Sequence, residues 1–239
     1  MRLGARTAAP ATVTAVCTVV TRWRPGAALE LLAVRDELAS RDFDEPAAWW
    51  PDAPGVVGGR DRQAGGSWCV SEIASGVTAL VLNRPERRTG TPSRGVLPLA
   101  AIAHGTAWPS VLDYRGMATF TLLLAGPTGV VGWEWDGAGL CRRDLPPGLH
   151  VATPRGIDPG DPRALRVTPL VATRPWLDVL SAERPSAAED ALIVRHEVDG
   201  DVYRTVFGQL ITAEPGSLGV RHSRTPWDAQ TWTTQDWTA

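Results

Sequence analysis

The sequence contains no lysine, only three cysteines and no long apolar run. The basic side chains other than histidine are 24 arginines, a usage typical of a chain encoded by GC-rich DNA. The formal charge of −2 argues against a strongly basic, nucleic-acid-binding protein. No apolar segment approaches the roughly 20 residues needed to cross a bilayer, so we expect no membrane span.

The cysteines are Cys17, Cys69 and Cys141, which are odd in number and far apart in the sequence. This spacing predicts neither a disulfide framework nor a CxxC metal site. The four histidines show no metal-ligand spacing among themselves or with the cysteines, so no metal is expected. Reduced thiols favour a cytoplasmic location.

Four common functional signatures are also missing. The chain contains no GxGxxG, GxxxxGK[ST], HExxH or GxSxG motif. Dinucleotide binding, P-loop chemistry, zinc proteolysis and α/β-hydrolase catalysis therefore lose their usual support.

The first sixteen residues superficially resemble a secretory signal, because they hold two arginines, no acid and many small residues. Pro10, Thr12 and Thr14 interrupt the apolar stretch, however. A lipoprotein signal would place a small residue before Cys17, and Val16 is larger and branched. We expect this segment not to direct export.

Alternating apolar residues and turn signals predict an α+β fold with mostly antiparallel strands in one domain. We expect a hairpin of residues 17–23 and 28–36 around Pro25-Gly26, which would bring Cys17 close to Arg35 and Asp36. Further strands are expected at 67–72, 77–83, 119–126 and 129–136, with a hairpin pair at 191–214 around Asp199-Gly200 and an edge strand at 218–224. Helices are expected at 93–105 and 172–183, and residues 37–66 are expected to form a loop.

The segment GGRDRQAGGSW, residues 58–68, allows two interpretations. Its two glycine pairs permit close backbone approach, so the segment could fold against a pocket and direct Arg60 inward. It could equally be a surface turn with solvated charges. The eleven tryptophans, with Trp227, Trp232 and Trp237 spaced five apart, likewise suit either a flat apolar ligand or ordinary packing.

Six short segments carry a resemblance to a known family. They are CTVV at 17–20, LAVRDE at 32–37, PAAWW at 46–50, GGRDRQAGGSW at 58–68, ALVLNRPE at 79–86 and SRG at 93–95. Together they resemble the NRDE family, also called the transport and Golgi organisation protein 2 family, over residues 17 to about 105. The resemblance implies an αββα sandwich similar to the N-terminal nucleophile hydrolases, especially the choloylglycine and penicillin V acylase branch.

Members of that family begin Met-Cys, whereas here the cysteine is the seventeenth residue and follows Val16. Valine is often encoded by GTG in GC-rich DNA, and GTG also serves as a start codon. We therefore expect translation to begin at residue 16, so that removal of the initiator methionine exposes Cys17. A proteolytically removed leader is the alternative, and residues 17–239 would form the single domain.

The resemblance implies that Cys17 is the nucleophile of a site. Asp36 would hold the α-amino group of Cys17, and Asn83 would donate to an oxyanion. A terminal cysteine carries a weak base beside its thiol, which an internal cysteine lacks.

Substrate binding is expected from Arg35, Arg60 and Trp68. Arg35 would either lower the pKa of the thiol or pair with a substrate carboxylate.

Three positions depart from the family pattern. Val34 stands where the family has the asparagine of NRDE, Pro154 replaces a second oxyanion asparagine, and Val206 replaces an arginine. The N-terminal half of the expected site is therefore intact and the C-terminal half is not.

The first functional hypothesis is a cysteine amidohydrolase acting on a non-peptide C–N bond of a small molecule, without a cofactor. The alternative is a protein that binds or moves haem or another apolar ligand without catalysis, because the resemblance links the family to haem trafficking. A third reading is a partner-binding remnant in which Cys17 only packs. The sequence leaves the substrate and the oligomeric state open.

Overall fold

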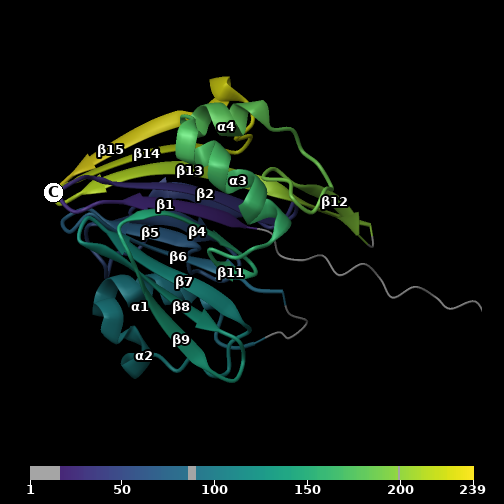
Figure 1. The fold of residues 1–239 in the computed structure, drawn as a ribbon. Helices are drawn as coiled ribbons and strands as arrows, with labels where there is room; N and C mark the ends of the chain where they lie inside the picture. The colour runs from purple at the N-terminus through teal and green to yellow at the C-terminus, as the bar shows by residue number, and fades with distance from the viewer. Residues whose placement is uncertain (1–16, 86–89, 199) are drawn as a thin grey trace, which may run out of the picture.

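The structure is a computed structural model that describes residues 17–85, 90–198 and 200–239. Two sheets lie face to face, and helices cover the outer side of each (Figure 1). Neighbouring strands of both sheets pair antiparallel. The predicted α+β class, with helix, sheet, sheet and helix layers, is confirmed.

The first sheet contains eight strands. They are β1 (Thr18–Trp23), β2 (Leu29–Leu38), β10 (Gly148–Thr153), β11 (Gly156–Ile157), β12 (Arg195–Val198), β13 (Asp201–Glu214), β14 (Ser217–Ser223) and β15 (Thr233–Thr238). The order is β11-β10-β1-β2-β13-β14-β15, and β12 pairs with β13. Strand β2 therefore lies between the N-terminal strand β1 and the C-terminal strand β13.

The second sheet contains seven strands in chain order. They are β3 (Phe43–Ala47), β4 (Val56–Asp61), β5 (Cys69–Glu72), β6 (Val77–Asn83), β7 (Phe120–Gly126), β8 (Gly129–Trp135) and β9 (Leu140–Leu145). Each strand pairs with its chain neighbours, so this sheet is a meander.

Helices pack against the outer faces of both sheets. Helices α1 (Leu97–His104) and α2 (Trp108–Val111) cover the second sheet, and α3 (Pro162–Thr173) and α4 (Trp176–Ala182) cover part of the first. Short 3-10 helices are η1 (Arg94–Val96), η2 (Gly105–Ala107) and η3 (Ala229–Thr231). None of the helices in the described residues is long and apolar enough to cross a membrane.

Strand alternation decides which side chains meet. In β1 and β2, Val19 and Ala33 face the core between the sheets, whereas Val20 and Val34 face α3 and α4. Cys17 packs on the inner side with the first group. By the same period of two, Arg35 projects inward and Asp36 projects outward toward α3.

The predicted hairpins are confirmed, and three expectations were wrong. Residues 37–66 are not one loop, because β3 and β4 lie within them. Strand β14 is not an edge strand, since β15 pairs along it. The expected helix at 172–183 begins only at Trp176, after Pro175, and residues 172–173 end the unpredicted helix α3.

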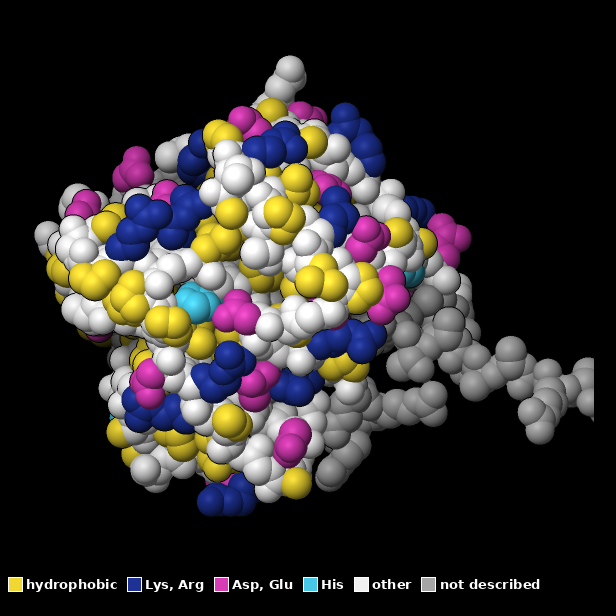
Figure 2. All heavy atoms as spheres, viewed as in Figure 1, with side chains coloured by type: hydrophobic (Ala, Val, Ile, Leu, Met, Phe, Trp, Pro, Cys, Tyr) yellow, Lys and Arg dark blue, Asp and Glu magenta, His cyan; other side chains and the backbone are white. Residues whose placement is uncertain are grey.

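Five of the tryptophans contribute to packing. Trp108 and Trp133 are fully buried, Trp237 packs against the core between the sheets, and Trp227 and Trp232 pack against the cluster that includes α3 and α4. On the face drawn in Figure 2, charged side chains of both signs are interspersed with apolar ones, as the formal charge of −2 leads one to expect.

Candidate functional site

Cys17 lies directly before β1, beside the end of β2, as the hairpin predicted. Its thiol donates to the backbone carbonyl of Asp36, with Sγ 3.7 Å from the oxygen. The hydroxyl of Tyr203 donates to the same carbonyl at 2.9 Å. The three residues come from β2, β13 and the segment before β1, so the pairing order of the first sheet brings them together.

The carboxylate of Asp36 is only half satisfied by hydrogen bonds. It is 2% exposed, and its Oδ1 accepts from the Thr205 hydroxyl. Within the described residues Oδ2 has no hydrogen-bond partner, although Nη1 of Arg163 lies 3.8 Å away. A buried carboxylate oxygen of this kind can accept from a donor placed beside Cys17.

Burial dominates the ionisation of both groups. It raises the pKa of the Cys17 thiol to about 12, and the negative charge of Asp36 adds to this effect. Burial also raises the pKa of Asp36 to about 7, opposed by the positive charge of Arg163 and the Thr205 hydrogen bond. As an internal residue, Cys17 therefore carries a thiol that is almost entirely protonated at neutral pH.

Five of the six predicted site residues line one cavity of about 120 Å³. Its wall includes Cys17, Asp36, Arg35, Trp68 and Asn83. The side chain of Asn83, at the end of β6, forms no hydrogen bond with another described residue, which leaves its amide able to donate to a ligand.

Arg60 does not line this cavity. Its guanidinium pairs with Asp44, with Nε 2.8 Å from Oδ2, and lies 4.5 Å from the centre of the Trp49 ring. The next residue along β4, Asp61, lines the cavity instead. Strand alternation explains the difference, since neighbouring side chains of a strand face opposite sides. Because both residues belong to β4, Arg60 and Asp61 cannot both point into the cavity.

Asp61 shapes the turn after β4. Its Oδ1 accepts from the backbone N–H groups of Gln63 and Ala64, both at 2.9 Å, and its Oδ2 lies 2.7 Å from Nε of Arg41. Burial raises the pKa of Asp61, but the Arg41 hydrogen bond and these amides outweigh burial and hold it below the usual range. Asp61 and Arg41 were not predicted as site residues.

The glycine pairs of segment 58–68 allow the Trp68 ring and the Gly95 backbone to approach the chain closely. A Cβ on Gly59 would lie 2.2 Å from the Trp68 ring, and one on Gly66 would lie 2.4 Å from the Gly95 carbonyl oxygen. The Ser67 hydroxyl oxygen lies 2.6 Å from the Gly59 carbonyl oxygen and 2.8 Å from that of Cys69, and its single proton can be donated to either. The segment 58–68 therefore folds tightly against the cavity wall, although Arg60 is not the side chain that it directs there.

Residues 16–119 match the family model described as Transport and Golgi organisation 2. This stretch of the chain is similar to Transport and Golgi organisation 2 sequences. The resemblance to that family, also called NRDE, is thereby confirmed over the matched residues. No curated protein matches the chain.

The family match ends before several partners of Asp36. Arg163, Tyr203 and Thr205 all follow residue 119, yet they contact or face Asp36. Sequence reasoning missed them because the resemblance weakens in this half. Helix α3, which carries Arg163, was also not predicted.

The three departures from the family pattern occupy packed positions. Val34 is buried against α3 and α4, and Val206 is buried with Phe43 and Phe207. Pro154 follows β10 and is buried. None of these residues lines the cavity of about 120 Å³, although Val34 and Cys17 both line a smaller hollow of about 20 Å³.

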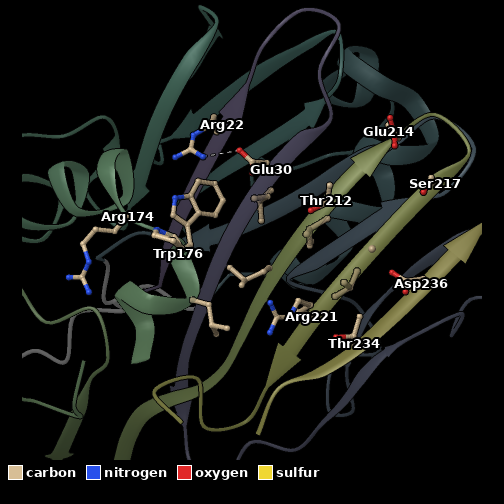
Figure 3. Close-up of a pocket in the computed structure, with 17 residues that line it drawn as sticks. Arg22, Glu30, Arg174, Trp176, Thr212, Glu214, Ser217, Arg221, Thr234 and Asp236 are labelled. Carbon is tan, nitrogen blue, oxygen red and sulfur yellow. Dashed lines mark hydrogen bonds and ion pairs between the residues drawn. The ribbon is translucent and has the colours of Figure 1, made fainter. Parts of the chain in front are cut away.

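A larger groove of about 550 Å³ lies on the outer face of the first sheet, beside the start of α4 (Figure 3). Arg22 pairs there with Glu30 at 2.9 Å and lies over the Trp176 ring, while Arg221 projects from β14. The lining contains no histidine, cysteine or methionine to ligate a haem iron. The cavity around Cys17 is too small for a macrocycle. Neither hollow fits haem, and haem binding stays a prediction for a Soret titration.

Two of the four histidines, His150 and His222, form hydrogen bonds or pack. His150 lies 2.7 Å from an Asp158 oxygen and 2.8 Å from the Pro146 carbonyl oxygen, and the Asp158 hydrogen bond raises its pKa. His222 lies beside the Phe207 ring, and burial lowers its pKa. Among the residues that the structure describes, no group of three potential metal ligands occurs.

Proposed function

We propose that the protein is an N-terminal cysteine amidohydrolase that cleaves a non-peptide C–N bond of a small molecule. One observation carries the proposal: Cys17, Asp36 and Asn83 line one cavity, and the buried Oδ2 of Asp36 has no hydrogen-bond partner among the described residues. A nucleophile, a group to hold its base and an oxyanion donor are the parts that acyl transfer requires.

The chemistry begins from a chain that starts at Cys17. The free α-amino group takes the thiol proton, and the sulfur attacks the carbonyl carbon of the substrate. Asn83 donates to the oxygen as negative charge develops there. The tetrahedral intermediate collapses, the leaving amine takes the proton back, and a thioester forms on Cys17. Water, deprotonated by the same amino group, then hydrolyses the thioester to a carboxylic acid and restores the thiol.

Asp36 supports the base rather than the substrate. Its unpaired Oδ2 would accept a hydrogen bond from the α-ammonium group of Cys17, which gives that buried oxygen the donor that it lacks. The positive ammonium would in turn lower the pKa values of the thiol and of Asp36 by direct charge attraction. A chain in which Cys17 is internal has no such group and would be inactive.

A translation start at residue 16, followed by removal of the initiator methionine, would make Cys17 the N-terminal residue. The family match begins at the same residue, which supports this start, while residues 1–16 lie outside the described structure. Intact-mass measurement of protein from the native host tests it. We expect a mass that begins at Cys17, and a chain that retains residues 1–16 contradicts the proposal.

Hydrolysis is tested with protein that begins at Cys17 and a panel of acyl amides. We expect product release in the unaltered protein and a loss on the order of a thousandfold or more in Cys17→Ala. Asn83→Ala should lower kcat by about a hundredfold. Cys141→Ala is the matched control, because Cys141 is exposed on β9 and should leave the rate unchanged. Equal rates in the unaltered protein and Cys17→Ala, or no hydrolysis in either, would overturn the proposal.

The proposed reaction would take place in the cytoplasm, as the three free cysteines suggest. Fractionation of the native host measures this directly.

A further inference from the structure

Arg35 is a buried cation with little compensation. Its side chain is 6% exposed and stands on the wall of the cavity that holds Cys17. An arginine side chain carries five N–H donors. Within the described residues, the guanidinium of Arg35 makes one hydrogen bond, from Nη2 to a Glu37 oxygen at 3.4 Å, and the buried Nη1 has no partner. A buried charge with so few bonds is costly unless something else pairs with it.

Two acids lie near Arg35, and Arg41 holds one of them, Asp61, more closely than Arg35 does, while Glu37 lies 3.4 Å from Arg35 and 3.8 Å from Arg41. Asp61 lies 2.7 Å from Arg41 but 3.8 Å from Arg35. Charge-assisted hydrogen bonds between arginine and carboxylate usually span about 2.7–2.9 Å. Arg41 therefore engages Asp61 at the ordinary distance, whereas Arg35 does not.

Aromatic rings hold the guanidinium of Arg35 in place. Its Cζ lies 4.6 Å from the centre of the Trp68 ring and 5.3 Å from that of Phe43. These rings also contact one another, at 5.4 Å between centres with an interplanar angle of 89°. Stacking fixes a guanidinium by its faces and leaves its N–H groups for ligands in its plane.

We propose that Arg35 binds the carboxylate of a small ligand in the cavity beside Cys17. A planar carboxylate matches the guanidinium fork and would supply the missing acceptor for Nη1. The cavity of about 120 Å³ equals the liquid volume of roughly four water molecules, which limits the part held there to a few non-hydrogen atoms. Resting on the proposed function, this names the substrate class as amides that carry a carboxylate close to the scissile bond.

Binding can be measured without hydrolysis. The experiment uses saturation-transfer NMR on the full chain with sodium acetate, and acetamide serves as the neutral probe of equal size. We expect transfer to the acetate methyl group and at least fivefold less to that of acetamide. Arg35→Gln should reduce the acetate signal at least fivefold, and Arg35→Lys should reduce it less.

Arg60→Gln is the matched control, because Arg60 is also a strand arginine paired with a carboxylate but lies in β4 of the second sheet, outside the cavity, and it should keep the acetate signal. Equal acetate signals in Arg35→Gln and the unaltered chain would overturn the subsite. So would equal signals from acetate and acetamide on the unaltered chain, a comparison that holds even if both Arg35 variants fail to fold. Absence of amide hydrolysis alone would overturn the proposed function and leave this result standing.

Discussion

At the scale of single residues, the site is governed by burial of charge. Asp36, Arg163 and Arg35 are all at most 6% exposed, and Asp36 lies 3.8 Å from Arg163 and accepts from Thr205 of β13. Desolvation of such charges is costly. A protein that keeps such groups keeps them at the expense of stability, which fits a functional role better than a packing role. The sequence could place Arg35 and Asp36 beside Cys17, but not show which side of the sheet each faces.

The first prediction concerns the pH dependence of stability. Burial raises the pKa of Asp36 from 3.8 to about 7, so its contribution to the free energy of unfolding is complete below about pH 4 and is lost as the pH rises to about 7. Asp36→Asn removes this loss. At about 1.4 kcal/mol per unit of pKa, the variant should gain several kcal/mol over the unaltered chain between pH 4 and pH 7.

Denaturant titrations across this pH range measure the effect. Asp44→Asn is the control, because Asp44 pairs with Arg62 and Arg60 and has a lowered pKa, so its contribution is lost as the pH falls. Parallel pH profiles for Asp36→Asn and the unaltered chain would contradict the prediction.

At the scale of elements, alternation and turn residues predicted the hairpins well, because each such strand has one apolar face. Strands β3 and β4 were not predicted, because they contain Pro46 and the pair Gly58-Gly59, which normally mark loops. Tertiary contact explains the glycines, whose missing side chains admit the Trp68 ring and the β5 backbone. Helix α3 was not predicted, because Pro162 and Pro169 lie within it and proline is normally taken to interrupt a helix.

The tight fit at β4 gives the second prediction. A methyl group on Gly59 would lie 2.2 Å from the Trp68 ring, which itself packs on Phe43 and Arg35. Gly59→Ala should therefore displace Trp68 and lower the free energy of unfolding by about 1–3 kcal/mol. Gly129→Ala, which meets no atom within 4 Å, should change it by less than about 1 kcal/mol. Equal stabilities of the two variants would show that Trp68 moves aside without cost.

At the scale of the whole molecule, the family match and the folded unit do not coincide. The match ends at residue 119, whereas β1 pairs with β10 and β2 pairs with β13, both of which follow it. The sequence could not reveal these pairings, because no local pattern connects strands so distant in the chain. The C-terminal half also supplies Arg163, Tyr203 and Thr205 to the site.

The third prediction follows from this topology. A fragment of residues 17–119 would leave the β1–β2 hairpin without either neighbour and would expose its two apolar faces. We expect it to lack a cooperative thermal transition, while the full chain unfolds cooperatively under the same conditions. A sharp transition in the fragment, by calorimetry or circular dichroism, would show that the matched part folds alone.

The hydroxyl of Tyr203 donates to the backbone carbonyl of Asp36, which lies 167 residues earlier in the chain. A ribosome delivers the two ends of this contact at opposite times, since the N-terminus emerges first and β13 nearly last. The enclosure around Cys17 is therefore completed only after synthesis is almost over. Under the proposed start, an aminopeptidase trims the initiator methionine from a nascent chain that has not yet closed around its own terminus. If the residues before Cys17 are not removed at this early stage, the protein folds with an amide in place of the free amino group of Cys17, and under the proposed function it would be inactive.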